Sequence, residues 1–307
     1  MEFLNPKATN IQFTKYFKPM GIFAIVITVL SLLSIVFPGV NYGIDFRGGI
    51  EAKIGFADGN VDTATVRKAL EGKLESLSVI KFEDANKKNL NEYLITAQGE
   101  SKEAVSDALS DALKTTFGAA SSSTWTVEKL DFVGPKAGSE LRKSAILSLF
   151  YTCILITLFL IFRFDIRYSP GALISIFHDL ALTMGFIVLM RIEFSVTVVA
   201  ALLTLAGYSI NDTVVIFDRI RETEGKNKGG DKSRIIDSAL NETLSRTLLT
   251  ALATLGSCLV LYFVGTSEIK DFALILFFGI IVGTFSSLFV STPMYFYTDR
   301  YMSRSKG

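Results

Sequence analysis

Apolar residues along this chain are gathered into six long runs that contain few charged side chains. The runs cover residues 20–37, 144–162, 171–190, 194–217, 246–265 and 272–296. A helix of about 20 apolar residues crosses a bilayer core of roughly 30 Å. The pattern therefore predicts an α-helical integral membrane protein with six transmembrane helices.

The segment between the first two runs, residues 38–143, has a different pattern. Alternating or short apolar stretches predict strands, and apolar residues at helical spacing predict amphipathic helices. In chain order these are a strand (44–56), a helix (61–77), a hairpin (79–83 and 93–97, turning across 86–91), a helix (101–117) and a strand (124–132). The order β-α-β-β-α-β is typical of an α+β ferredoxin-like domain.

Lysine and arginine predict how the chain is oriented. They gather in residues 1–19, 163–167, 218–245 and 298–307, whereas the short loops on the opposite side hold only Arg191 and Lys270. Cytoplasmic loops carry the excess of positive charge. We therefore expect both termini and the 218–245 loop to be cytoplasmic, and the 38–143 domain to be external, in the periplasm.

Composition excludes two broad classes of protein. Half of the residues are apolar and 20% are charged, and this charge lies mostly outside the six runs, which excludes a soluble enzyme. The net charge is +1, so no general basic field indicates nucleic-acid binding. We expect no cofactor, no metal and no catalytic group.

Three residues stand out in the interior of the runs because they can be charged near neutral pH. His178, the single histidine, precedes Asp179 in the third run, and Asp212 lies in the fourth. Such residues are costly in a bilayer and usually serve an ion pathway or proton relay. The alternative for His178 and Asp179 is a hydrogen-bonded pair that only fixes helix packing.

Polar residues lie near Asp212 on its own predicted helix, and a second polar stripe lies on the next predicted helix. Tyr208 lies one turn before it and Asn211 is adjacent, while Arg246 and Thr250 begin the fifth run. An arginine stays charged, so an aspartate facing it can release and regain a proton at modest cost. The alternative for Arg246 is an ordinary anchor at the membrane surface.

Four motifs in the chain resemble one family. They are residues 43–49 (with Gly43, Asp45, Arg47, Gly48 and Gly49), 177–179, 207–222 and 244–248. Together these residues are similar to the SecF-type members of the SecD/SecF protein-export family, which belongs to the resistance-nodulation-division (RND) superfamily. The first motif also occurs in SecD-type members, and the resemblance covers nearly the whole chain.

This resemblance implies a function in the Sec pathway. A SecF-type subunit pairs with SecD beside the Sec translocation channel (SecY, SecE, SecG and an accessory subunit) in the cell inner membrane. The pair uses the proton-motive force to assist translocation of preproteins. It also implies that Asp212 carries the proton, that Arg246 is its partner, and that Asp179 and His178 support the relay.

Two other functions fit parts of the pattern. A stand-alone proton-coupled exporter of the same superfamily would usually have twelve spans in one chain, not six. An intramembrane aspartyl protease would use Asp179 and Asp212 as a catalytic pair. Those proteases carry Gly-x-Gly-Asp, whereas Tyr208-Ser-Ile-Asn precedes Asp212 here.

Overall fold

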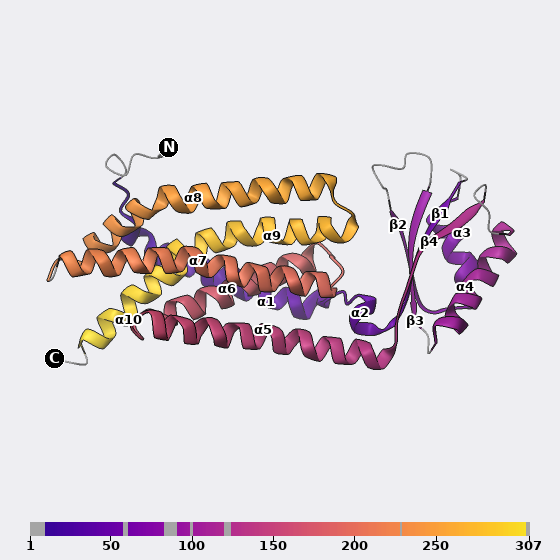
Figure 1. The fold of residues 1–307 in the computed structure, drawn as a ribbon, viewed down its shortest axis with the longest axis horizontal. Coiled ribbons are helices and arrows are strands. Elements are labelled where there is room, and N and C mark those ends of the chain that lie inside the picture. Colours follow the sequence, from indigo (N-terminus) through magenta and orange to yellow (C-terminus); the bar gives the residue numbers. More distant parts are fainter. Residues whose placement is uncertain are drawn as a thin grey trace. The chain divides into compact units, whose positions relative to one another are not determined.

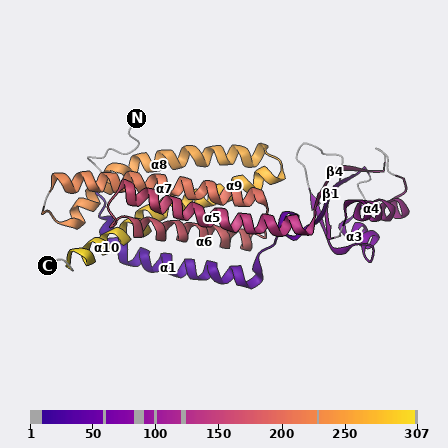
Figure 2. The ribbon, with the colours of Figure 1, turned by 60° about the horizontal axis from the view of Figure 1, so that its bottom comes forward.

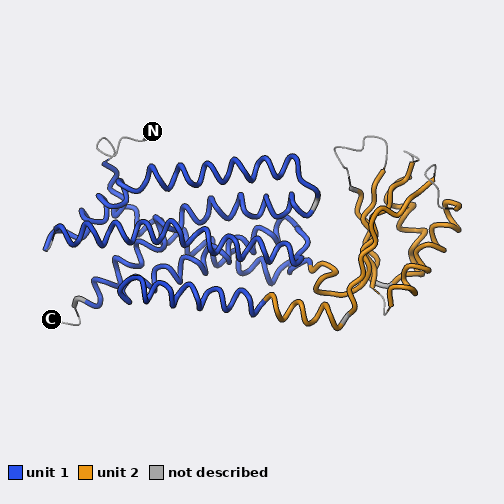
Figure 3. The backbone as a smooth tube through the Cα atoms, in the orientation of Figure 1, with its two compact units in different colours: residues 1–41, 146–307 blue, residues 42–145 orange. Residues whose placement is uncertain are grey.

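The structure is a computed structural model that describes residues 10–57, 61–82, 91–98, 101–119, 124–227 and 229–304. The chain forms two compact units, one of residues 1–41 with 146–307 and the other of residues 42–145 (Figure 3). Most of the predicted hairpin turn, residues 86–90, lies outside the described residues.

The first unit is a bundle of helices. Its elements are η1 (Phe13–Tyr16), α1 (Phe17–Ser34), η2 (Ile35–Gly39), α5 (Pro135–Arg163, which begins in the second unit), α6 (Ser169–Leu189), α7 (Val196–Lys226), α8 (Lys232–Val264), α9 (Ser267–Ser286), η3 (Ser287–Ser291) and α10 (Thr292–Arg304). In the described part of the chain six helices are long and apolar enough to cross a membrane, which confirms the predicted number. The start of η1 and the end of α10 lie at one end of this unit, called here the terminal end (Figure 1).

Helix α6 is the most enclosed of the six. About 61% of its apolar stretch is buried, against 11% for α5 and 17% for α8. It packs against α1, α7 and α9, and α9 also packs against α7 and α8 (Figures 1 and 2). The interior of the bundle is therefore built around α6, α7 and α9.

Small residues let these helices approach closely. A side chain at Gly185 of α6 would overlap Ser31 of α1, whose hydroxyl donates to the Ala181 carbonyl at 2.6 Å. A Cβ on Gly279 of α9 would lie 2.5 Å from Leu205 of α7. Such contacts are typical of helix pairs in membranes, where small residues replace the hydrophobic driving force.

Segment 218–245 is not the loop that the sequence predicted. Helix α7 continues to Lys226 and α8 already begins at Lys232. The reason is that these extensions are amphipathic and bury an apolar face in the bundle core. That face consists of Ile220 on α7 and Ile236, Ala239 and Leu240 on α8.

A cluster of charges ties four of these elements together at the terminal end. Asp299 of α10, 3% exposed, accepts from Arg167 before α6 at 2.8 Å and from Lys232 of α8 at 2.9 Å. Lys232 and Tyr295 also donate to Glu224 of α7, at 2.5 and 2.6 Å. The ends of α6, α7, α8 and α10 are therefore fixed relative to one another.

The second unit contains a four-stranded antiparallel sheet. Its elements are α2 (Ile44–Arg47), β1 (Gly49–Phe56), α3 (Thr63–Leu70), β2 (Glu75–Phe82), β3 (Asn91–Gln98), α4 (Lys102–Phe117) and β4 (Trp125–Val133). The strand order is β2-β3-β1-β4, and α3 and α4 cover one face (Figure 1). This confirms the predicted β-α-β-β-α-β order of a ferredoxin-like domain.

Two of its predicted boundaries are wrong. Residues 44–47 form the helical turn α2 instead of the start of a strand, and the helix predicted over 61–77 ends at Leu70. Gly48 and Gly49 have φ of +75° and +128°, which only glycine adopts without strain. These two residues end α2 and turn the chain into β1.

We predict that residues 42–145, made as a soluble fragment, fold on their own. The unit has its own apolar core, which includes Ile54, Val66, Ile95 and Leu113. Circular dichroism is expected to show helix and strand signals and one cooperative thermal transition. A spectrum typical of an unfolded chain would contradict the prediction.

Within that fragment, Gly49→Ala is expected to lower the free energy of unfolding by about 1–3 kcal/mol, the usual cost of a strained backbone conformation. The added Cβ also lacks space, because it would overlap the Ala97 carbonyl of β3. Gly134→Ala is the matched control, since the nearest atom to its Cβ would be 4.0 Å away. Urea unfolding curves compare the two, and equal midpoints for both variants would refute the prediction.

Candidate functional site

Besides Asp299 at the terminal end, two carboxylates among the described residues of the bundle are buried. Asp179 of α6 is 1% exposed and Asp212 of α7 is 5% exposed. Both were predicted from the sequence as ionisable residues at membrane depth. Their surroundings differ sharply.

Asp179 is surrounded by hydrogen-bond donors. Its Oδ1 lies 3.0 Å from Nδ1 of His178, which is itself 4% exposed. Its Oδ2 accepts from the hydroxyl of Ser286 on α9 at 2.8 Å and from the hydroxyl of Ser209 on α7. Donors from three helices therefore converge on this carboxylate.

Asp212 has no such partners. Among the described residues, no hydrogen bond or ion pair reaches its carboxylate, and the cation whose charge acts on it is Arg246 of α8. The guanidinium of Arg246 likewise makes no hydrogen bond or ion pair with a described residue. This buried acid and this unpaired cation are the two groups of the site that stay free to change partners.

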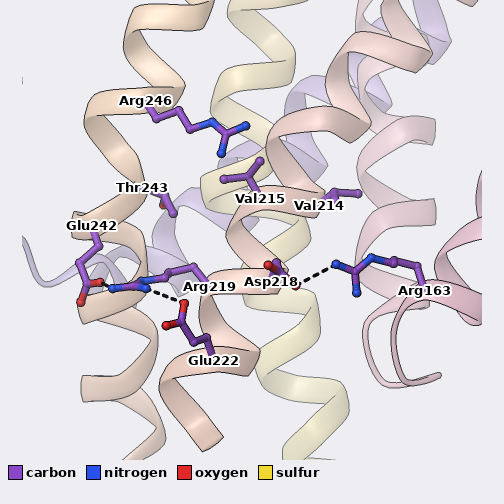
Figure 4. Close-up of a pocket in the computed structure, with 9 residues that line it drawn as sticks. All are labelled: Arg163, Val214, Val215, Asp218, Arg219, Glu222, Glu242, Thr243 and Arg246. Atoms are coloured by element: carbon purple, nitrogen blue, oxygen red, sulfur yellow. Dashed lines mark hydrogen bonds and ion pairs between the residues drawn. The ribbon is translucent and has the colours of Figure 1, made fainter. Parts of the chain in front are cut away.

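A cavity of about 700 Å³ lies beside this pair, toward the terminal end. Figure 4 shows Arg246 at its upper edge, with the guanidinium directed toward Val215 of α7. Val215 lies three residues after Asp212, which is about one helical turn. The cavity thus reaches within one turn of the buried acid.

Ion pairs line the rest of the cavity. Asp218 accepts from Arg163 at 3.2 Å and from Arg221 at 3.0 Å. Arg219 pairs with Glu222 at 2.6 Å and also with Glu242 of α8 (Figure 4). Among the cations that line the cavity, Arg246 is therefore the one whose charge is not already compensated by a described carboxylate.

Among the described residues, none of the other predicted site residues is hydrogen-bonded to Asp212. The hydroxyl of Thr254 on α8 donates to Tyr208 at 3.2 Å, which joins α8 to α7. Thr250 donates to the carbonyls of its own helix, at Arg246 and Thr247. Asn211 is exposed on α7. The motif residues Gly43, Asp45, Arg47, Gly48 and Gly49 belong to the second unit.

Two residues of the site were missed from the sequence. Ser209 falls within the motif of residues 207–222, and Ser286 lies on α9 three residues after Gly283. A Cβ on Gly283 would lie 3.3 Å from the Cβ of Ser209, so the small residue brings α7 and α9 together at this level. The spacing of Gly279 and Gly283, four residues apart on α9, is the feature of the sequence that indicates a close helix contact here.

The chemistry open to this arrangement is proton transfer. Inside an apolar bundle a carboxyl group is tolerated in its neutral, protonated form. In its charged form it is stabilised by a nearby arginine, so it can bind and release a proton. Asp212 is a buried carboxyl group of this kind, and Arg246 lines the neighbouring cavity. Among the described residues, no group of three or more His, Cys, Asp or Glu side chains forms a metal site.

Family models match most of the chain. The model described as "Protein export membrane protein SecD/SecF, C-terminal" matches residues 112–300. The model described as "SecD/SecF GG Motif" matches residues 33–57, which include Gly48 and Gly49.

Two relatives named protein translocase subunit SecF are similar to most of the chain. The protein translocase subunit SecF of Gemmatimonas aurantiaca is 38% identical over 83% of this chain and 77% of its own. The protein translocase subunit SecF of Magnetococcus marinus is 37% identical over 95% of this chain and 93% of its own.

Solved structures share the fold. The crystal structure of SecDF, a translocon-associated membrane protein from Thermus thermophilus, has a TM-score of 0.82 and 32% identity over 95% of this chain. SecDF in its super-membrane-facing form has a TM-score of 0.70 and 31% identity. This chain spans 39% of the first of these SecDF chains. The chain therefore belongs to the SecD/SecF family of protein export membrane proteins, whose members are non-enzymatic components of protein transport.

Proposed function

We propose that this chain pairs with a SecD-type partner and uses the proton-motive force to assist protein export through the Sec channel. The observation that carries the proposal is a buried Asp212 with no hydrogen-bond partner among the described residues, under the influence of the uncompensated charge of Arg246, which lines a cavity. One charge crossing the membrane is worth about 2.3 kcal/mol per 100 mV, so inward proton flow can drive movement.

Exposed polar positions on α7 and α8 support a partner within the membrane. Thr204, Gly207 and Asn211 are exposed on α7, and Arg246 and Ser257 on α8. Small and polar residues on a spanning helix favour contact with another helix over contact with lipid. This surface suits a SecD-type subunit, which the SecDF structures carry in one chain with the part that is similar to this protein.

The distribution of charge supports the orientation. The terminal end carries Arg163, Arg167, Arg219 and Arg221 together with the end of α10. Under the positive-inside rule this end faces the cytoplasm, and the second unit is periplasmic. With this orientation the cavity opens toward the cytoplasm and provides the exit for protons that reach Asp212.

Beyond SecD, the proposal assigns partners from the same machinery. The chain would act beside SecY, SecE and SecG of the inner membrane, with preproteins as the cargo that its periplasmic unit contacts. The names of the relatives, protein translocase subunit SecF, support this assignment.

The hydrogen bonds of Asp179 disfavour the protease alternative. A protease pair requires two carboxylates that share one proton. Asp179 instead uses both oxygens to accept from His178, Ser209 and Ser286.

We predict that Asp212→Asn abolishes the gradient-driven part of translocation. Asparagine is nearly isosteric but cannot carry a proton, and removal of an acid–base group commonly costs about 100-fold or more. Translocation into vesicles with and without a proton gradient measures the effect. Asp231→Asn, at an acid that is 59% exposed before α8, is the control and should behave as wild type. Normal gradient-driven translocation by Asp212→Asn would refute the proposal.

For Arg246→Lys we expect normal membrane insertion and SecD binding but a several-fold loss of gradient-driven translocation. A lysine ammonium is a compact, strongly hydrated charge that can lose its proton when desolvated, whereas a guanidinium stays charged. The matched control is Arg163→Lys, because this arginine lines the same cavity but is already paired with Asp218. Equal activity of both variants at equal protein levels would identify Arg246 as a surface anchor only.

A further inference from the structure

The hydrogen bonds around Asp179 connect three spanning helices through one side chain. His178 lies on α6 beside it, Ser209 reaches it from α7, and Ser286 reaches it from α9. All four residues are buried, with exposed fractions between 0% and 4%. We refer to Asp179, His178, Ser209 and Ser286 as the Asp179 cluster.

The direction of these bonds follows from the donors available. A hydroxyl has one proton, and a carboxylate only accepts. Ser175 donates to Ser286 at 3.0 Å, which leaves the proton of Ser286 for Asp179 or for the Gly283 carbonyl at 3.1 Å. An ionised Asp179 can only accept, so the 3.0 Å contact then requires the tautomer of His178 that donates through Nδ1, and Nε2 of His178 has no partner among the described residues.

In this arrangement the carboxylate of Asp179 has hydrogen-bond donors on both oxygens and is almost fully buried. Oδ2 accepts from two hydroxyls and Oδ1 accepts from the imidazole, and only 1% of the residue is exposed. The cavity that approaches Asp212 is lined by residues of α5, α7 and α8, and none of them belongs to the Asp179 cluster. Asp212, by contrast, has no hydrogen bond from a described residue.

The cluster is connected to Asp212 through α7. Ser209 lies three residues before Asp212, on the same side of this helix. Its bond to Asp179 and its close contact with Gly283 fix the rotation and height of α7 against α6 and α9. Both quantities decide where Asp212 lies relative to Arg246 on α8.

We propose that Asp179 is a positioning residue that holds Asp212 in place through Ser209, and that it is not a second proton carrier. This inference rests on the proposed function, in which Asp212 carries the proton. It assigns Ser209 and Ser286 as the residues through which the position of α7 is set.

Two substitutions of Asp179 distinguish a proton carrier from a positioning residue. In Asp179→Asn the amide oxygen still accepts from both serines, and the amide NH₂ donates to Nδ1 of His178 once the imidazole proton moves to Nε2. A proton carrier cannot tolerate this change, but a positioning residue can. Asp179→Leu instead leaves buried hydroxyls without an acceptor, which costs free energy.

The test compares Asp179→Asn, Asp179→Leu and Asp212→Asn in the full chain paired with its SecD-type partner in vesicles. The ratio of translocation with a proton gradient to translocation without one is measured at equal protein levels. We expect Asp179→Asn to keep at least about half of the gradient-driven part, and Asp179→Leu to lose most of it. Asp179→Asn as inactive as Asp212→Asn would overturn the inference.

A second pair of variants keeps the inference testable if Asp179→Leu fails to assemble. Ser209→Ala is expected to lower the gradient-driven part several-fold. Ser257→Ala is the matched control, because this exposed serine bonds only to the Ala253 carbonyl of its own helix, at 3.2 Å. Equal activity of both serine variants would overturn the positioning role, whereas gradient-driven activity in Asp212→Asn would refute the proposed function instead.

Discussion

A charged carboxylate inside an apolar bundle has to find its hydrogen-bond donors within the protein, and Asp179 shows how this constraint shapes the structure. Its donors come from α6, α7 and α9, so these three helices can pack only where His178, Ser209 and Ser286 reach the same two oxygens. Glycine on α9 provides the close approach that such short side chains require. This arrangement holds α7, which carries Asp212, against α6 and α9.

Asp212 is also buried, but it lacks the hydrogen-bond donors that Asp179 has. It lies one turn from Ser209 on α7, yet no described residue donates to it, and the positive charge that acts on it is that of Arg246, which lines a cavity. Structures retain such a costly group where it takes part in function. The bundle therefore combines one carboxylate whose partners are fixed with one whose partners can change.

Much of the fold and of the candidate site could be predicted from the sequence, because charged residues are rare within apolar runs and are easily identified there. Six apolar runs gave six spans, and His178, Asp179, Asp212 and Arg246 stood out within or beside them. Ser209 and Ser286 did not, because a serine in a spanning helix usually bonds to its own backbone, as Ser257 does. The helical extensions of α7 and α8 were missed because charged residues separate their apolar residues in the sequence.

The difference between the two aspartates can be measured directly. Infrared difference spectra of the complex in vesicles, recorded between low and high pH, detect each carboxyl group that gains a proton through its C=O stretch. We predict a band that is absent from Asp212→Asn and unchanged in Asp179→Asn. A band that persists in Asp212→Asn and disappears from Asp179→Asn would contradict the assignment of the proton to Asp212.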